Sequence, residues 1–239
     1  MSEEHTVRLF DDELKELAHK VAEMGGLAER MVDDSITALS KDDPDSAEQI
    51  VLLDRRVDQM QRHIEERAIL LIARRQPVAD DLRAIVGALR IASDLERIGD
   101  LAKNIAKRVI AIRGEFRTKR IALGVEHIAE LALIQLKNVL DAFVSLNADA
   151  ALTVRNQDDE IDALYTSLFR ELLTYMMEDP RTISFCAHLL FCAKNIERIG
   201  DHATNIAETV YYISTGDQLD EPRAKADETP LELFQKSGA

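Results

Sequence analysis

The sequence predicts an all-α protein made of two tandem antiparallel three-helix bundles that are related by an internal duplication. The duplication is visible in the segments 91–108 (IASDLERIGDLAKNIAKR) and 192–209 (CAKNIERIGDHATNIAET), where ten of eighteen aligned residues are identical at an offset of 101. Hydrophobic residues make up 46% of the chain, aromatic residues only 5%, and tryptophan is absent. An aliphatic core of this kind is typical of packed helices, and nine glycines and five prolines are too few for the turns of an all-β fold.

The first repeat is expected to contain three helices, because apolar residues recur at helical spacing and turn signals separate the runs. An Asp-Pro pair at 43–44 should cap and start the second helix, and a Gln-Pro pair at 76–77 should turn the chain, since a residue before proline avoids the α region. Gly25 and Gly26 are expected to interrupt the first helix. The predicted helices cover residues 6–40, 44–75 and 77–113.

The second repeat follows the same plan. Asn147 and the pair Asp179-Pro180 separate its helices, and Gly216 ends the last one. The predicted helices cover residues 117–146, 148–178 and 181–214. The charged tail contains two prolines, and we expect it to be disordered. The sequence thus divides into a first bundle at 6–114, a second bundle at 116–215 and a tail at 216–239.

The net charge of −14 argues against functions that need a positively charged surface. It would repel the phosphate backbone of nucleic acids and anionic lipid headgroups, so we expect no nucleic-acid binding. The N-terminus carries early acidic residues without the apolar segment of a signal peptide, and no run of eighteen apolar residues could span a membrane. We therefore expect a soluble cytoplasmic protein in which Cys192 is a buried, reduced thiol.

Each repeat carries two pairs of acidic residues, one pair on each helix of its last hairpin. The members of a pair are four residues apart, which places both carboxylates on one face of the helix. Counted from the proline at each turn, the two pairs lie at nearly the same height, so we expect them to meet in a groove at the outer surface. The eight residues are Asp54, Asp58, Glu96 and Asp100 in the first repeat and Asp158, Asp162, Glu197 and Asp201 in the second.

Four carboxylates that lie together repel one another, and a cation or a basic side chain lowers that energy. Oxygen ligands suit hard cations such as Mg²⁺, Ca²⁺, Mn²⁺ or Fe³⁺, so the eight residues are candidate metal ligands. His202, whose counterpart in the first repeat is Leu101, is expected at the rim of the acidic row rather than as a ligand. The alternative to metal is a set of solvated ion pairs with nearby basic residues, namely Arg55, Arg97, Lys103 and Lys107.

The pattern ERIGD-x-A-x-N-I-A occurs in two copies, each preceded by D-x-x-x-D on the previous helix. This pattern resembles the PhoU family, and the resemblance extends from about residue 6 to residue 214. It implies a cytoplasmic accessory and regulatory protein of bacterial phosphate uptake, not an enzyme, with no catalytic residues. Family members bind metal at E/D-x-x-x-D motifs, in some cases as multinuclear iron or zinc clusters. The resemblance therefore implies iron, zinc, manganese or magnesium ions at the eight acidic residues.

The resemblance also implies a negative regulator of the phosphate-starvation response. Such a protein links the ATPase of a phosphate ABC transporter (PstB-like) to a sensor histidine kinase (PhoR-like), and we expect a homodimer. Two alternatives stay open: a metal-free helical scaffold or adaptor, and a metal-dependent hydrolase. The hydrolase alternative lacks a candidate general base or nucleophile beside the carboxylates. Asp94 and Asn195 occupy equivalent positions, so the acidic field differs between the two halves.

Overall fold

The computed structural model describes residues 2–113 and 119–219, apart from the side chains of residues 2–8, 119–121 and 158. All regular structure within these residues is helical, which confirms the predicted all-α class, and none of the described helices is long and apolar enough to cross a membrane. The bundle boundaries predicted at 114 and 116 lie outside the described residues, as does the tail from 220 onward. The elements are α1 (Ser2–Lys41), α2 (Pro44–Arg75), α3 (Ala79–Ala111), α4 (Lys119–Ser145), α5 (Ala148–Asn156), α6 (Asp158–Glu178), the 3₁₀ helix η1 (Pro180–Thr182) and α7 (Ile183–Thr215).

Local chemistry sets both ends of α2. The side chain of Asp43 accepts a hydrogen bond from the backbone nitrogen of Ser46 at 3.0 Å, and Pro44 takes the first helical position. At the other end Gln76 adopts the left-handed conformation, and its N–H donates to the carbonyl of Ile72 at 3.1 Å. Both predicted turn signals are confirmed.

Gly25 and Gly26 do not interrupt α1, so that prediction is wrong. Gly25 is buried against α4, where a Cβ atom would lie 2.5 Å from Cδ2 of Leu140, whereas Gly26 faces open space. The absence of a side chain at Gly25 lets α1 and α4 approach closely. Packing against the core keeps this helix continuous, although each glycine in a helix costs about 1 kcal/mol of stability relative to alanine.

The helix predicted at 148–178 is divided at Gln157 into α5 and α6, which corrects the prediction of one continuous helix. The N–H of Gln157 donates to the carbonyl of Val154 at 3.1 Å, so the chain makes a tighter turn at this point. Three acidic residues follow at 158–160. Negative charge is favourable at a helix N-terminus because it opposes the helix dipole, so these residues favour a new start.

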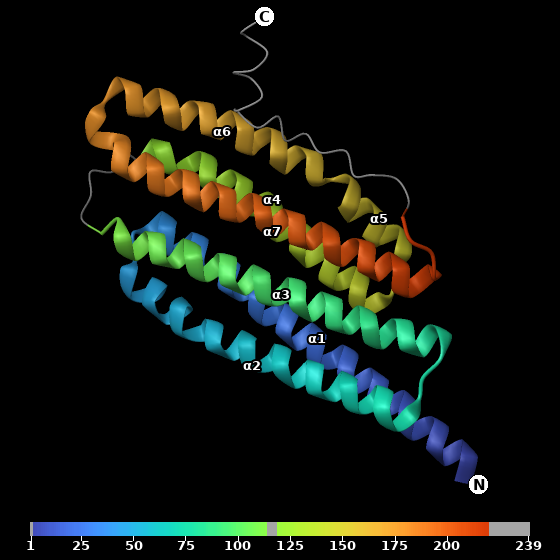
Figure 1. Cartoon of the computed structure of the whole chain (residues 1–239). Helices are drawn as coiled ribbons and strands as arrows, with labels where there is room; N and C mark the ends of the chain where they lie inside the picture. Colours follow the sequence, from blue (N-terminus) through green and yellow to red (C-terminus); the bar gives the residue numbers. More distant parts are fainter. Residues whose placement is uncertain (1, 114–118, 220–239) are drawn as a thin grey trace, which may run out of the picture.

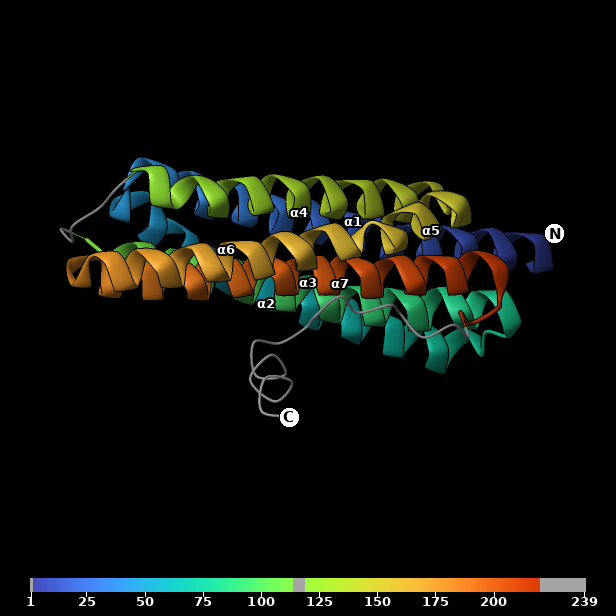
Figure 2. The same cartoon turned by 90° about the horizontal axis from the view of Figure 1, so that it is seen from above.

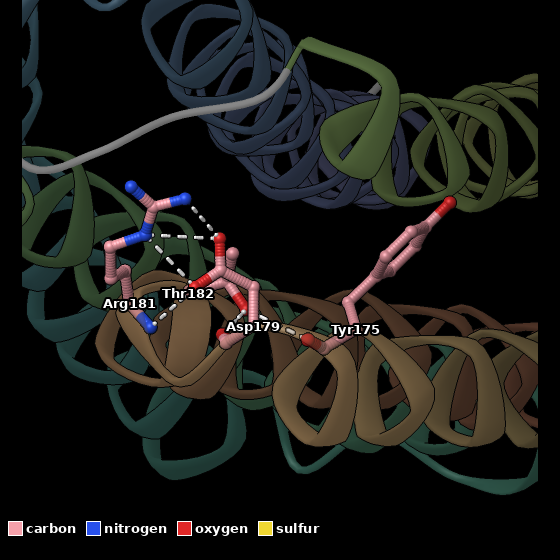
Figure 3. A network of polar contacts seen from close by, with 4 residues as sticks. All are labelled: Tyr175, Asp179, Arg181 and Thr182. Atoms are coloured by element: carbon pink, nitrogen blue, oxygen red, sulfur yellow. Dashed lines mark hydrogen bonds and ion pairs between the residues drawn. The ribbon is translucent and has the colours of Figure 1, made fainter.

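Asp179 organises the turn between α6 and α7 (Figure 3). Its carboxylate accepts hydrogen bonds from the backbone nitrogen of Arg181 at 3.0 Å and from Nη2 of the same arginine at 2.8 Å. The hydroxyl of Thr182 lies 3.0 Å from the carbonyl of Tyr175 and 2.8 Å from that of Asp179, and donates to them. These bonds stabilise η1, so α7 begins at Ile183, two residues later than predicted.

The two helices with the repeated motif, α3 and α7, lie side by side and antiparallel at the centre of an elongated molecule (Figure 1). Helices α1 and α4 form a layer behind them, and α2 and α6 lie at the two flanks (Figures 1 and 2). A Cβ atom at Gly87 of α3 would lie 2.3 Å from Cδ1 of Ile213 of α7, so these helices pack closely. One continuous apolar core, which includes the buried Cys192, therefore joins the two repeats.

Candidate functional site

The first acidic row consists of Asp54 and Asp58 on α2 and Glu96 and Asp100 on α3. Burial raises the pKa of the Glu96 carboxyl, and Asp100 raises it further by repulsion. Arg97 offsets part of this increase, while Asp58 and Asp54 add to it from the neighbouring helix. The charges of Asp54 and Asp58 on α2 therefore act on Glu96 of α3.

A lysine joins the two helices inside the first acidic row. The Nζ atom of Lys103 donates a hydrogen bond of 2.7 Å to Oδ2 of Asp54 on α2, and it also donates to Asp100 on its own helix. Burial lowers the pKa of Lys103, but the hydrogen bonds and charges of these two aspartates outweigh that effect and raise the pKa above its usual value. An ion-paired arrangement is therefore present in the first row, with Lys103 as its bridge.

The first acidic row is not confined to the outer surface, which corrects the position expected from the sequence. The side chain of Asp54 is only 9% exposed, and that of Lys103 is 19% exposed. Asp58, Glu96 and Asp100 are partly buried. Asp54 lies on the flank of the apolar stripe of α2, and the packing of α3 against that flank covers it. A charge buried in this way requires a partner, which Lys103 supplies.

The second acidic row consists of Asp162 on α6 and Glu197 and Asp201 on α7; the side chain of its fourth predicted member, Asp158, lies outside the described part of the structure. Glu197 is 5% exposed. The Nζ atom of Lys194 donates to its Oε1 at 2.8 Å, whereas its buried Oε2 has no hydrogen-bond partner among the described residues. Burial raises the pKa of Glu197 against the opposing effect of Lys194, and Asp201 and Asp162 raise it further.

The two rows differ in how well they fit a metal ion. Among the described side chains, no three acidic, histidine or cysteine groups converge closely enough to hold one. In the first row the residues do not fit, because Lys103 lies between Asp54 and Asp100. In the second row the unpaired buried oxygen of Glu197 is a feature that a hard cation would satisfy. Metal binding at the eight acidic residues stays a prediction.

The two halves meet in a polar contact that the sequence did not predict. Nδ1 of His202 lies 2.8 Å from Oδ1 of Asp94, and Nδ2 of Asn205 donates to the same oxygen at 3.4 Å. Asp94 and Asn205 also line a groove of about 580 Å³ between α3 and α7. The signal was present in the repeat, because His202 and Asp94 replace the leucine and asparagine found at the equivalent positions 101 and 195.

Comparison with known proteins agrees with the repeated architecture. The sequence model of the PhoU domain matches residues 21–109 and residues 125–210, so each repeat contains one match. The phosphate-specific transport system accessory protein PhoU homolog of Rhizobium meliloti (strain 1021) is 58% identical over 229 residues, which are 96% of this chain and 97% of the relative. The homolog of the same name in Caulobacter vibrioides (strain NA1000 / CB15N) is 47% identical over 224 residues, covering 94% of this chain and 97% of the relative.

Two crystal structures share the fold. PhoU from Pseudomonas aeruginosa superposes with a TM-score of 0.83 at 41% identity, over 87% of this chain and 100% of that one. The phosphate transport system regulatory protein PhoU from Streptococcus pneumoniae superposes with a TM-score of 0.81 at 30% identity, over 89% of this chain and 100% of that one. Since the matches include both repeats and nearly the whole length of the relatives, this chain belongs to the PhoU family.

Proposed function

We propose that this protein is a regulatory accessory component of a bacterial phosphate uptake system and a negative regulator of the phosphate-starvation response. The observation that carries this proposal is the match of both repeats to the PhoU domain, together with relatives 58% and 47% identical over nearly their full length. Both relatives are named as accessory proteins of phosphate-specific transport systems. One solved relative is named as a regulatory protein of phosphate transport.

In this proposal the protein acts in the cytoplasm as a homodimer and links a sensor histidine kinase to the ATPase of a phosphate ABC transporter. Its role is binding rather than chemical transformation. Long helices and a net charge of −14 offer extended acidic faces that suit basic partner surfaces. Exposed apolar side chains at the hairpin ends, such as Val78 and Met177, supply surface that an interface can bury.

The test uses the purified chain with the cytoplasmic part of the kinase and with the transporter ATPase. We expect binding to both at micromolar concentration, and a shift of the kinase from autophosphorylation toward dephosphorylation of its response regulator. An unrelated helical protein of similar negative charge is the control for non-specific electrostatic effects. Absence of binding to either partner at micromolar concentration, together with unchanged kinase activity, would contradict the proposal.

We further propose that a hard cation or zinc binds at the second acidic row, held by Asp162, Glu197 and Asp201 together with Asp158. Such an ion would neutralise the carboxylates and hold α6 at a set distance from α7. The support is Oε2 of Glu197, which is buried and has no hydrogen-bond partner among the side chains that the structure describes. The competing candidate is a metal-free scaffold. The contact of Lys103 with Asp54 supports this candidate in the first row, because the ammonium group neutralises the carboxylate without a metal ion.

Metal analysis of protein purified without chelator separates these two candidates. Cation binding predicts bound iron, manganese, magnesium or zinc, and a melting temperature that falls after chelation and recovers when the ion is returned. The metal-free scaffold predicts no bound metal and a melting temperature that does not respond to added Mn²⁺, Fe³⁺ or Zn²⁺.

A further inference from the structure

A groove of about 670 Å³ lies between α1 and α4, the two helices that form the layer behind α3 and α7 (Figure 2). Residues that line this α1–α4 groove include Gly26, Glu29, Asp33 and Asp34 of α1 and Leu133 and Ile134 of α4. Both acidic rows lie elsewhere, on α2, α3, α6 and α7. The α1–α4 groove is therefore a separate candidate site.

Gly26 leaves an empty hole in the wall of the α1–α4 groove. A Cβ atom at Gly26 would meet no other part of the described structure within 4 Å, although glycine is unfavourable inside a helix. At the neighbouring Gly25, the missing side chain gives Leu140 of α4 room against the backbone of α1. Gly26 offers the same room about 100° further around the helix, toward the outside. Packing within the described chain does not explain this glycine, whereas a close approach by another molecule does.

Apolar surface lies in the same groove as this hole. The side chain of Ile134 is 54% exposed, and the neighbouring Leu133 is partly buried against the core. A large apolar side chain that entered at Gly26 would cover part of this surface and remove it from water. Anchors of this kind, which fill a pocket beside a helix, supply much of the binding energy of protein interfaces.

The charged side chains of the α1–α4 groove have no partners within the chain. None of them forms a hydrogen bond or an ion pair with another residue that the structure describes: Glu29, Arg30, Asp33, Asp34 and Lys137. Acidic groups outnumber basic ones, and the negative charge of Asp141 also acts on Glu29. The groove therefore favours an occupant with basic side chains. A second copy of this chain suits it less, because that copy also carries a net charge of −14.

The shape of the groove favours a helical occupant. Helices α1 and α4 lie side by side and run in opposite directions (Figure 2). The groove between two such helices can hold a third helix, whose side chains enter between theirs.

We propose that the α1–α4 groove docks a basic amphipathic helix of a partner protein. A large apolar side chain of that helix fills the hole at Gly26 beside Ile134, and its lysine or arginine residues face Asp33 and Asp34. This proposal rests on the regulatory role proposed above, and it names the surface through which the chain binds its kinase or its transporter ATPase.

The first test fills the hole with a side chain of the protein itself. Gly26→Leu is compared with Ala163→Leu, which adds the same side chain at an exposed position of α6. Dissociation constants are measured by calorimetry for the cytoplasmic part of the kinase and for the transporter ATPase. We expect Gly26→Leu to weaken the binding of one of these partners by about tenfold or more, and Ala163→Leu to bind both like the wild type.

Loss of structure would not explain this result, because leucine favours a helix more than glycine does. Circular dichroism should show an unchanged helix content for Gly26→Leu, and its melting temperature should not fall. Unchanged affinity of folded Gly26→Leu for both partners would overturn the proposal.

The second test examines the charge of the groove. Asp33→Lys reverses a charge inside it, whereas Asp12→Lys makes the same change at an exposed position nearer the start of α1. We expect Asp33→Lys to weaken the binding of the same partner by about tenfold, an effect that shrinks at high salt, and Asp12→Lys to change it by less than about twofold. Equal weakening by both variants would contradict a basic helix in the groove.

The outcomes separate this proposal from the proposed regulatory role. If the wild type binds neither partner, the regulatory role fails and the docking site fails with it. If the wild type binds a partner and Gly26→Leu binds it equally well, the regulatory role stands and only the docking site is refuted. Light scattering covers the remaining case, since a change from dimer to monomer in Gly26→Leu would assign the groove to a second copy of the chain instead.

Discussion

His202 in α7 and Asp94 in α3 connect the two repeats through a contact of 2.8 Å between Nδ1 and Oδ1. Both side chains are 18% exposed, so the contact is shielded from solvent more than an ordinary surface pair. Leu101 is the first-repeat equivalent of His202, and Asn195 is the second-repeat equivalent of Asp94. Both residues of the contact therefore differ from their counterparts in the other repeat. The pair is a feature of the assembled molecule rather than of either repeat alone.

A double-mutant cycle with Asp94→Asn and His202→Leu measures the strength of this contact. These substitutions place at the contact the residue types found at the equivalent positions. We expect a coupling free energy of about 0.5–1 kcal/mol, because the pair is partly shielded but still reaches solvent. Urea unfolding of the wild type, both single variants and the double variant gives the value. Strict additivity of the two single effects would mean that the contact does not stabilise the fold.

Removal of the bridging lysine should destabilise the protein strongly. Lys103→Met leaves Asp54 largely buried without its partner, and breaking a buried pair in this way costs about 3 kcal/mol. Restoring neutrality with the double variant Asp54→Asn/Lys103→Met should recover part of the loss. The control is Lys107→Met on the exposed face of α3, which should change the free energy of unfolding by less than about 0.5 kcal/mol. The free energies of unfolding are measured in urea in the presence of a chelator. Equal losses of stability in Lys103→Met and Lys107→Met would contradict the bridging role of Lys103.

The adjacent glycines of α1 should respond differently to substitution by alanine. Gly26→Ala meets open space, so it should stabilise the protein by about 1 kcal/mol through helix propensity. Gly25→Ala has the same gain in propensity, but its Cβ would lie 2.5 Å from Leu140, and overpacking costs about 1–3 kcal/mol. We therefore expect a neutral to destabilising effect at Gly25. Equal stabilisation by both changes, measured by thermal or urea unfolding, would disagree with the close approach of α1 and α4.

The stability should carry a pH dependence from Glu29, which lies beside Lys137 in the groove between α1 and α4. Burial raises the pKa of the Glu29 carboxyl above its ordinary value. The positive charge of Lys137 lowers this pKa in part, whereas the negative charges of Asp141 and Asp33 raise it further. The folded state therefore keeps the proton to higher pH than the unfolded chain. The resulting stabilisation is complete below the unfolded pKa and is lost as the pH rises through the folded pKa.

Substitution of Glu29 by glutamine isolates this effect. The free energy of unfolding of Glu29→Gln, minus that of the wild type, should become more positive between about pH 4 and about pH 7. The direction follows because only the wild type must ionise a partly buried carboxyl group in this range. Urea unfolding at both pH values gives the difference, and a difference that is constant or that falls would conflict with the burial of this side chain.

Comparison of the two repeats shows where sequence reasoning succeeds. The cap at Asp43 and the turn at Gln76 act over a few residues, so the sequence predicted them correctly. Uniform helical rise also predicted that Asp54 and Asp100 lie at the same height, and the contacts of Lys103 with both residues agree with this in the first repeat. The break at Gln157 was missed, since Asp158 after it was interpreted only as a candidate ligand and not as part of a helix start.

The sequence by itself determined the helical class, the duplication and the common height of Asp54 and Asp100, because these depend on short-range periodicity and on counting along a chain of constant rise. Only the tertiary structure decided how each charge is neutralised. Whether Asp54 is covered, whether Lys103 reaches across to it, and which oxygen of Glu197 stays unpaired depend on how neighbouring helices are rotated and on the rotamers of long side chains. A helical pattern gives the face of one helix, but the neighbour that covers this face is set by packing between segments far apart in the chain.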